Sequence, residues 1–221
     1  MHPRNFLFLF TLLSLRAISG AENPASASGE RVSAGAVIDE MNLARQSPAT
    51  YAIYLEEMRS RYDGDFLVLP GRTRIRTKEG LRAVDEAIKF LHSTKPLQPL
   101  IRAAGMCRGA ADHCADQAGG RFGHGGTDGS SPGQRMNRYG VWGSSWGENI
   151  SYGKTTAREV VLTLIIDDGL RSRKHRKNIF NSKFNYAGAA SGPHAQYRTV
   201  CSIDFAGSYT ERDRGLVARS D

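Results

Sequence analysis

The chain has 221 residues, of which 40% are hydrophobic, and this is enough for one sizeable domain with a hydrophobic core. Its formal net charge is +8. The basic residues are scattered over loops and are not interleaved with stacking aromatic residues, which argues against a nucleic-acid-binding protein. This charge has two interpretations. Either the basic residues are only solvated in loops, or they attract the protein weakly to anionic envelope surfaces.

The start of the chain is typical of a secretory signal peptide, which we predict over residues 1–20. A short basic start precedes an apolar run from Phe6 to Leu15, and small residues follow. This run is too short for a stable transmembrane anchor, so we expect no anchor after cleavage. An uncleaved N-terminal anchor is the alternative. Residues 21–31 are rich in Ala, Ser, Gly and Glu and are predicted to form a flexible leader.

Four helices are predicted in the next stretch of the chain. Apolar residues at helical spacing begin after Gly35, and Ser47-Pro48 ends this helix and starts a second one. A Gly-, Pro- and Arg-rich loop is predicted over residues 63–78. Two further helices follow, over residues 79–93 and 100–118.

Shorter elements are predicted in the second half of the chain. Alternating residues predict two strands joined by a turn at Gly192-Pro193, with His194 exposed beside it. Helices that come first and a small antiparallel sheet that follows indicate an α+β fold, with helices against the faces of the sheet. The predicted segments are a glycine-rich loop (123–133), a short helix (134–139), a short strand (148–152), an apolar helix (156–167), the two strands (184–191 and 197–205) and a charged tail (209–221).

Three cysteines remain to be placed, and their odd number allows at most one disulfide within the chain. Cys107 and Cys114 are two turns apart on one predicted helix, about 10 Å, which is too far to bridge. A bond from Cys201 to one of them and three reduced thiols are both open.

Several short stretches, taken in order, resemble the CAP superfamily of cysteine-rich secretory proteins, antigen 5 and pathogenesis-related 1 proteins, in its bacterial type (the SCP domain). The resemblance covers Val32 to Gly207 and implies a CAP/SCP domain over residues 32–208, folded as a three-layer α-β-α sandwich. The matching stretches are Asn42-Leu43-Ala44-Arg45, His124 with Asp128-Gly129-Ser130, Arg135 before Tyr139-Gly140, Gly147-Glu148-Asn149-Ile150, and His175 to Ile179.

The resemblance implies a central cavity lined by two histidines and two acidic residues. His124, Glu148 and His175 follow from the motifs, and Asp167 is the second acid, with Asp168 competing for that role. The resemblance also implies that His124 and His175 hold Zn²⁺ or another divalent cation, with the carboxylates as hydrogen-bond partners of the imidazoles. The chain itself has no local metal-binding motif such as His-Glu-x-x-His.

The resemblance favours a secreted binding module without catalytic activity, acting at the cell envelope or outside the cell. Its partner would be an unknown small apolar ligand or an envelope component. A metal-dependent hydrolase with Glu148 as general base is one alternative. A sterol- or lipid-binding protein, in which the four cavity residues only stabilise the fold, is another. A serine hydrolase is disfavoured, because the chain lacks a Gly-x-Ser-x-Gly motif.

Overall fold

The computed structural model describes residues 32–212. The predicted signal peptide (1–20), the leader (21–31) and most of the predicted tail (213–221) lie outside the described residues. Among the helices of residues 32–212, none combines the length and the hydropathy that a membrane span needs.

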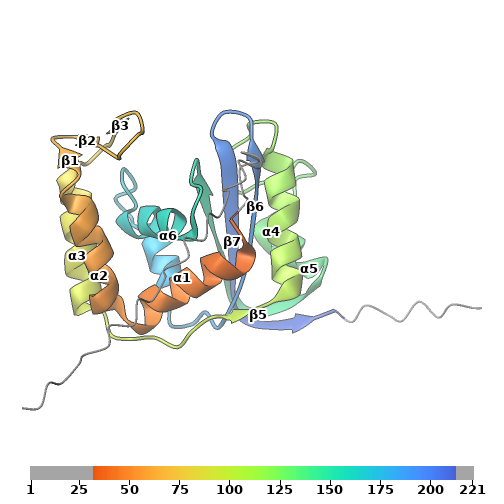
Figure 1. Ribbon diagram of the computed structural model, residues 1–221. Coiled ribbons are helices and arrows are strands. Elements are labelled where there is room, and N and C mark those ends of the chain that lie inside the picture. Colours follow the sequence, from red (N-terminus) through yellow and green to blue (C-terminus); the bar gives the residue numbers. More distant parts are fainter. Residues whose placement is uncertain (1–31, 213–221) are drawn as a thin grey trace, which may run out of the picture.

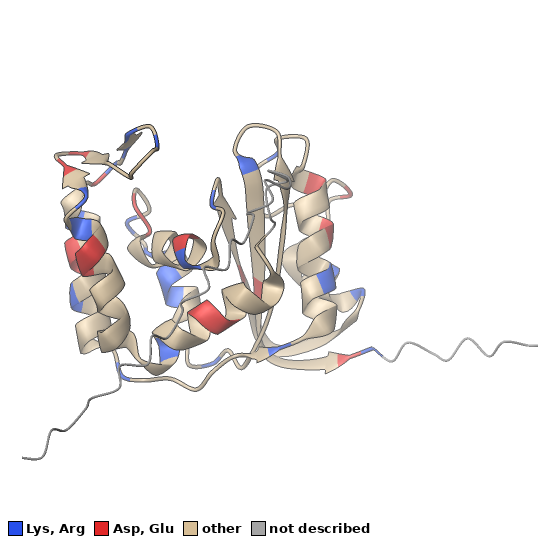
Figure 2. Ribbon diagram, in the orientation of Figure 1, with Lys and Arg blue, Asp and Glu red and all other residues tan. Residues whose placement is uncertain are grey.

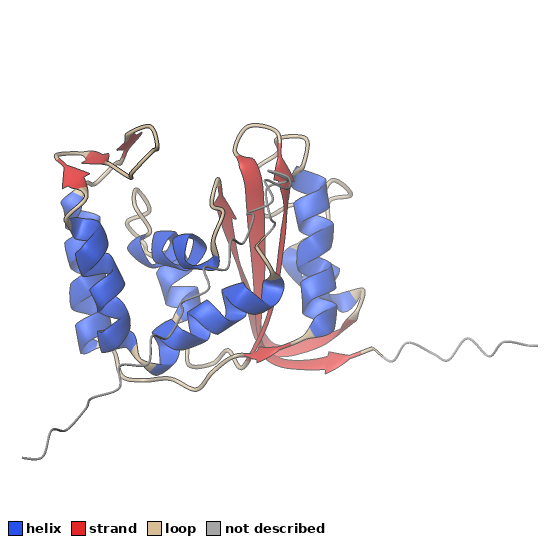
Figure 3. Cartoon of the chain, in the orientation of Figure 1, coloured by secondary structure: helices blue, strands red, loops and turns tan. Residues whose placement is uncertain are grey.

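A four-stranded sheet in the order β4-β6-β7-β5 forms the centre of the fold (Figure 3). β7 pairs antiparallel with both β5 and β6, and β4 pairs parallel with the first two residues of β6. The sheet is therefore mainly antiparallel, as predicted. The strands are β4 (Ile101–Arg102), β5 (Gly140–Tyr152), β6 (Tyr186–His194) and β7 (Arg198–Glu211).

Helices cover both faces of this sheet and make a three-layer α-β-α sandwich (Figure 1). α4 and α5 lie on one face, α1 and α6 lie on the other, and α2 and α3 pack farther out. A small three-stranded sheet follows α2. The helices are α1 (Ala34–Gln46), α2 (Pro48–Arg59), α3 (Leu81–Ser93), α4 (Ala104–Gln117), α5 (Pro132–Asn137), α6 (Ala157–Ile166) and α7 (Lys174–Ile179); the small sheet is β1 (Tyr62–Asp63), β2 (Phe66–Leu67) and β3 (Ile75–Arg76).

Local sequence signals set several helix boundaries. Pro48 occupies the first turn of α2, where a missing backbone N–H costs nothing, as its sequence position predicts. α6 begins with a capping box, in which Thr156 and Glu159 each satisfy a backbone N–H of the other. These two signals explain why the first and second helices separate at Ser47 and why α6 starts where it does.

Arg45 connects the first helix to the far end of the chain. Its side chain is 1% exposed, and its guanidinium donates to four backbone carbonyls. Charge-assisted hydrogen bonds of this kind are stronger than neutral ones, and they replace the water that the buried cation has lost. The acceptors are the carbonyl oxygens of Gln98 (3.0 Å), Ile179 (2.6 Å), Asn181 (3.1 Å) and Phe184 (3.2 Å).

The predicted turn at Gly192-Pro193 is wrong. Both residues belong to β6, and the turn lies three residues later, between His194 and Arg198. β4 covers only the beginning of β6, so the end that holds Pro193 is an edge where a missing N–H is tolerated. His194 is consequently buried at 2% exposure, not exposed as predicted. β5 also starts earlier than the predicted strand, at Gly140.

All three cysteines are free thiols. Cys114 packs with Ile150 and Val200 on the α4 face of the sheet. Cys201 follows Val200 on β7 and belongs to the core on the opposite face. Because successive strand residues point to opposite faces, the sheet separates Cys201 from the two thiols of α4. The three-thiol alternative is therefore the one that this fold accommodates.

Candidate functional site

Glu148 is the buried acid of the first histidine pair. Its side chain is 1% exposed, and its Oε1 lies 2.7 Å from Nδ1 of His124. Its Oε2 accepts from Nη2 of Arg135 at 2.7 Å and from the hydroxyl of Ser202 at 3.1 Å. A carboxylate oxygen accepts the hydrogen bond, so Nδ1 of His124 donates it, and in the neutral imidazole Nε2 is then the nitrogen with the lone pair. The His124 side chain is 57% exposed, which leaves that nitrogen accessible.

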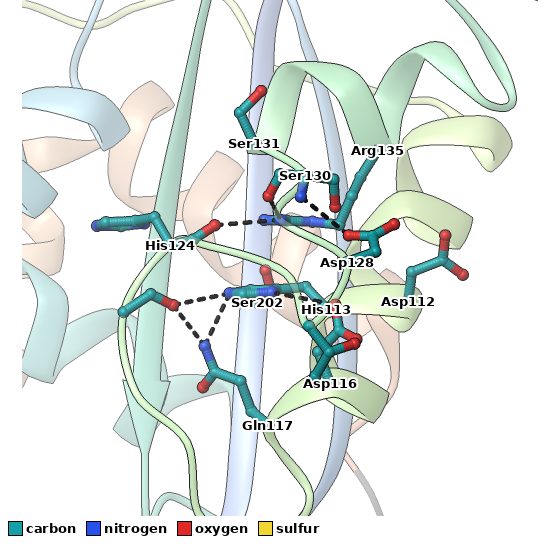
Figure 4. Close-up of polar contacts among 12 residues, drawn as sticks. Asp112, His113, Asp116, Gln117, His124, Asp128, Ser130, Ser131, Arg135 and Ser202 are labelled. Carbon is teal, nitrogen blue, oxygen red and sulfur yellow. Dashed lines mark hydrogen bonds and ion pairs between the residues drawn. The ribbon is translucent and has the colours of Figure 1, made fainter.

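Arg135 shapes the loop that carries His124 (Figure 4). Its side chain is fully buried, and Nη1 donates to the carbonyls of His124 (3.1 Å) and Ser130 (2.9 Å). α5, which presents Arg135, begins with a capping box between Ser131 and Gln134. The guanidinium of Arg135 therefore forms a buried ion pair with Glu148, and its other N–H groups donate to the backbone of the loop that carries His124. Such additional hydrogen bonds help to compensate for the cost of burying the two charges.

Two further titratable residues lie beside Glu148. Asp204 is its cross-strand partner on β7 and is completely buried. Burial, and then the neighbouring carboxylate of Glu148, raise the pKa of Asp204 well above its usual value and favour its neutral form. His113 has a fully buried side chain with Nε2 3.9 Å from Oε1 of Glu148. Burial lowers the pKa of His113 and favours its neutral form.

The second histidine pair is His175 with Asp167. Nδ1 of His175 lies 2.7 Å from Oδ1 of Asp167, and the backbone N–H of His175 donates to Oδ2 at 2.9 Å. Asp167 is the C-cap of α6 and adopts a left-handed backbone conformation (φ 56°). Asp168 instead accepts from the backbone N–H groups of Lys78 and Glu79, both at 2.8 Å. The left-handed conformation at the end of α6 therefore directs the carboxylate of Asp167 toward His175 on α7. The carboxylate of Asp168 contacts the segment before α3 instead.

Asn149 and Asn178 connect the second pair to the strand of the first. The side chain of Asn149 donates to the carbonyl of His175 at 3.0 Å. Asn178 donates to the side-chain oxygen of Asn149 at 2.8 Å. α7 is therefore attached to β5 at the residue that follows Glu148. Both asparagines belong to the motifs found in the sequence, but the motifs did not predict that they connect α7 to β5.

The two pairs share one arrangement, in which a buried carboxylate orients a histidine through Nδ1 and leaves Nε2 without a protein partner among the described residues. This is the arrangement by which carboxylates orient metal-binding imidazoles. However, the described residues contain no group of three or more His, Cys, Asp or Glu side chains positioned to hold a metal ion. These donors do not make a closed structural zinc site, which needs four protein ligands.

A pocket of about 460 Å³ opens beside the second pair. His175 and Asp167 lie on one side, and the aromatic rings of Phe122, Tyr152 and Tyr197 line the pocket as well. The ring centroids of Tyr152 and Tyr197 are 5.8 Å apart, and Phe122 is 5.1 Å from Tyr152. The lining of this pocket therefore combines aromatic rings with the His175–Asp167 pair.

The sequence of the chain matches the model of the cysteine-rich secretory protein (CAP) family over residues 73–205. This match covers more than half of the chain. The chain belongs to the CAP family. The α-β-α sandwich is the fold of that family, and the matched range includes His124, Glu148, Asp167 and His175. No curated protein matches the chain.

Three solved structures resemble parts of this CAP protein. An extracellular protein from Bacillus anthracis with an SCP domain is 21% identical, with a TM-score of 0.41 over 50% of this chain and 34% of that one. An outer surface protein from Borrelia burgdorferi is 18% identical, with a TM-score of 0.42 over 50% of this chain and 78% of that one. A cysteine-rich secretory protein from Staphylococcus aureus is 14% identical, with a TM-score of 0.37 over 62% of this chain and 42% of that one. The chain thus spans about a third of the Bacillus protein.

Proposed function

We propose that this CAP protein is a binding module that acts at the cell envelope or outside the cell, with the His124 and His175 pairs at its binding site. The observation that supports this is the free Nε2 of two histidines that buried carboxylates already hold in place. Side chains fixed in this way lose little conformational entropy when they bind a ligand. The site is therefore organised before the ligand arrives.

The environment of Glu148 weighs against catalysis by this residue. A general base must accept a proton from a bound water or substrate. Both carboxylate oxygens of Glu148 already accept hydrogen bonds, and the side chain is 1% exposed. Binding without turnover follows more directly from this geometry than hydrolysis does.

We extend the proposal to Zn²⁺ or another divalent cation as a ligand of Nε2 of His124 and Nε2 of His175. Such an ion would supply a Lewis acid with open positions for a ligand donor atom. Glu148 and Asp167 would hold the two imidazoles in the required tautomer. The affinity would be modest, since two protein donors are fewer than the three of common zinc sites.

Calorimetric titration of Zn²⁺ into the chelator-stripped protein tests this extension. We expect binding that the His124→Ala/His175→Ala double variant loses. The matched control is His92→Ala, which removes an exposed histidine that pairs with Glu56 on the surface. Binding that survives the double variant, or that His92→Ala removes, would contradict the assignment of the metal to the cavity.

An apolar ligand is the second candidate, because an apolar pocket of about 140 Å³ lies between α2, α6 and the small sheet. A pocket of this size accommodates a group like a benzene ring. Whole drug-sized ligands occupy about 300–1,000 Å³, so a sterol would have to displace the small sheet. Titration with benzene, followed by protection of Leu67 and Ile75 from hydrogen exchange, tests this candidate; unchanged exchange at saturating benzene would rule it out.

A further inference from the structure

A second depression adjoins the pocket beside the His175 pair and shares Tyr197 with it, and three segments distant in sequence meet there. It is a pocket of about 520 Å³ between residues 71–75, 153–155 and 197–199. The first segment follows β2, the second follows β5, and the third leads into β7. Figure 2 shows basic positions both on the segment near the small sheet and on the β6–β7 hairpin. The lining residues are Gly71, Arg72, Thr73, Ile75, Gly153, Thr155, Tyr197, Arg198 and Thr199.

The charge of this pocket is positive. Two arginines line it, and no acidic residue is among its lining residues. Arg72 has an ion pair with Glu159 (2.7 Å), whereas the side chain of Arg198 makes no hydrogen bond or ion pair with any residue of the described range 32–212. Lys154, between two lining residues, lines the adjoining pockets and likewise has no side-chain partner within that range. An anionic ligand in this pocket would find one cation, Arg198, that lacks a carboxylate partner among the described residues, and a second, Arg72, that it would share with Glu159.

Arg198 occupies a backbone position that does not suit it. Its φ is 69°, in the left-handed region, where glycine and asparagine are the usual residues. It follows the three-residue turn of the β6–β7 hairpin, and the last position of such turns is commonly glycine. An arginine there carries strain that a glycine would avoid, and strain of this kind is concentrated at functional sites. Arg198, whose guanidinium is unpaired within the described range, is one of the residues that line the pocket.

Tyr197 adds an aromatic face next to Arg198. The residue is 49% exposed, and its ring packs against Tyr152, Phe122 and His194 with centroid distances of 5.8, 5.6 and 5.6 Å. Those contacts hold the ring in one orientation while part of it remains open to the pocket. The π face of an aromatic ring is negative, so it attracts the weakly positive C–H face of a sugar ring.

Hydroxyl groups complete the lining. Thr73, Thr155 and Thr199 each contribute one, and a hydroxyl accepts hydrogen bonds even where it already donates one. Thr155 and Thr199 donate to Glu159 and to the carbonyl of Lys154, which fixes their positions. Sugar hydroxyls are suitable donors for such oxygens.

We propose that this pocket binds an acidic carbohydrate, with a pyranose face on Tyr197 and its carboxylate on Arg198 and Arg72. A neutral sugar leaves the guanidinium groups unused. An acidic peptide uses the arginines but gains nothing from the combination of one open ring face and three hydroxyls. The acidic sugar is the class that uses all three features of the lining.

The test compares tetragalacturonate with its methyl ester, which has the same sugar rings without the charges, by calorimetry at low salt. We expect the acid to bind and the ester to bind at least about tenfold more weakly, a difference of about 1.4 kcal/mol. Tyr197→Ala should lower the affinity for the acid by about tenfold, and Tyr197→Phe should retain it within about twofold.

Arg198→Asn separates binding from folding. Asparagine tolerates the left-handed conformation, so this variant should bind the acid at least about tenfold more weakly while its melting temperature is unchanged or higher. Lys183→Gln removes an exposed cation elsewhere and is the control for net charge. The proposal is overturned by equal binding of the acid and the ester, by absence of binding to the wild-type protein, or by unaltered affinity in Tyr197→Ala and Arg198→Asn. Poly-glutamate that competes equally well and is insensitive to Tyr197→Ala would also overturn it, in favour of a plain anion site.

Discussion

The buried carboxyl of Asp204 gives the clearest quantitative prediction. This side chain is completely buried next to Glu148, and its pKa is raised by burial and by the neighbouring carboxylate. In the unfolded chain, an aspartate titrates near pH 3.9. Above that pH the folded protein keeps a proton that the unfolded chain has released. Stability that is present below about pH 4 is therefore lost as the pH rises toward the pKa of the folded state.

The magnitude follows from one proton. Over the window in which only the folded state is protonated, the free energy of unfolding falls by about 1.4 kcal/mol for each pH unit. Asp204→Asn removes this dependence, because the amide is neutral at every pH. The stability of the variant relative to the wild-type protein should thus increase with pH from about pH 4 upward.

Urea unfolding of both proteins at several pH values between about 4 and 7 measures this difference directly. Asp39→Asn makes the same chemical change at an exposed position of α1 and controls for effects on the unfolded chain. Parallel stability curves for the wild-type protein and Asp204→Asn would refute the reasoning, since they would mean that Asp204 has the same protonation in both states.

Three further predictions concern the core, the thiols and the second pair. Arg45→Met should lower the free energy of unfolding by about 3–5 kcal/mol, because four buried or partly buried carbonyls lose their donor; a loss below about 1 kcal/mol in urea unfolding would contradict this. In the folded protein at about pH 8, a thiol-specific reagent should modify Cys107 at most, since burial raises the pKa of Cys114 to about 12 and that of Cys201 to about 11. Unfolding should release all three thiols, and rapid labelling of more than one before unfolding would disagree with the fold. Asp167→Asn should change the tautomer equilibrium of the His175 ring in NMR spectra, as its carboxylate acceptor is lost, whereas the neighbouring Asp168→Asn should leave that equilibrium unaltered.

The order of helices and strands could be predicted because its signals are local. Pro48, the Thr156 capping box and the apolar periodicity of α3 act within a few residues, so they are readable from the chain. The mistaken turn at Gly192-Pro193 shows the limit of such signals. Whether a proline ends a strand depends on whether another strand needs its N–H, and that depends on how far β4 extends along β6.

The motifs identified His124, Glu148 and His175, and the structure adds what surrounds them. Asp204 lies 56 positions after Glu148 in the sequence and meets it only through the register of β5 and β7. Nothing near Asp204 in the sequence distinguishes it from a surface aspartate. The same applies to His113, whose side chain is fully buried beside Glu148.

The sequence by itself thus determined the family and the α+β order of elements, because these depend on composition, spacing and short motifs. The tertiary structure decided which side chains are neighbours: Asp167 rather than Asp168 beside His175, Asp204 opposite Glu148, and Arg198 beside Tyr197 in a second pocket. The reason is physical. Hydrogen bonds and charge interactions fall off within a few ångströms, and only the register of strands and the ends of helices bring distant residues that close.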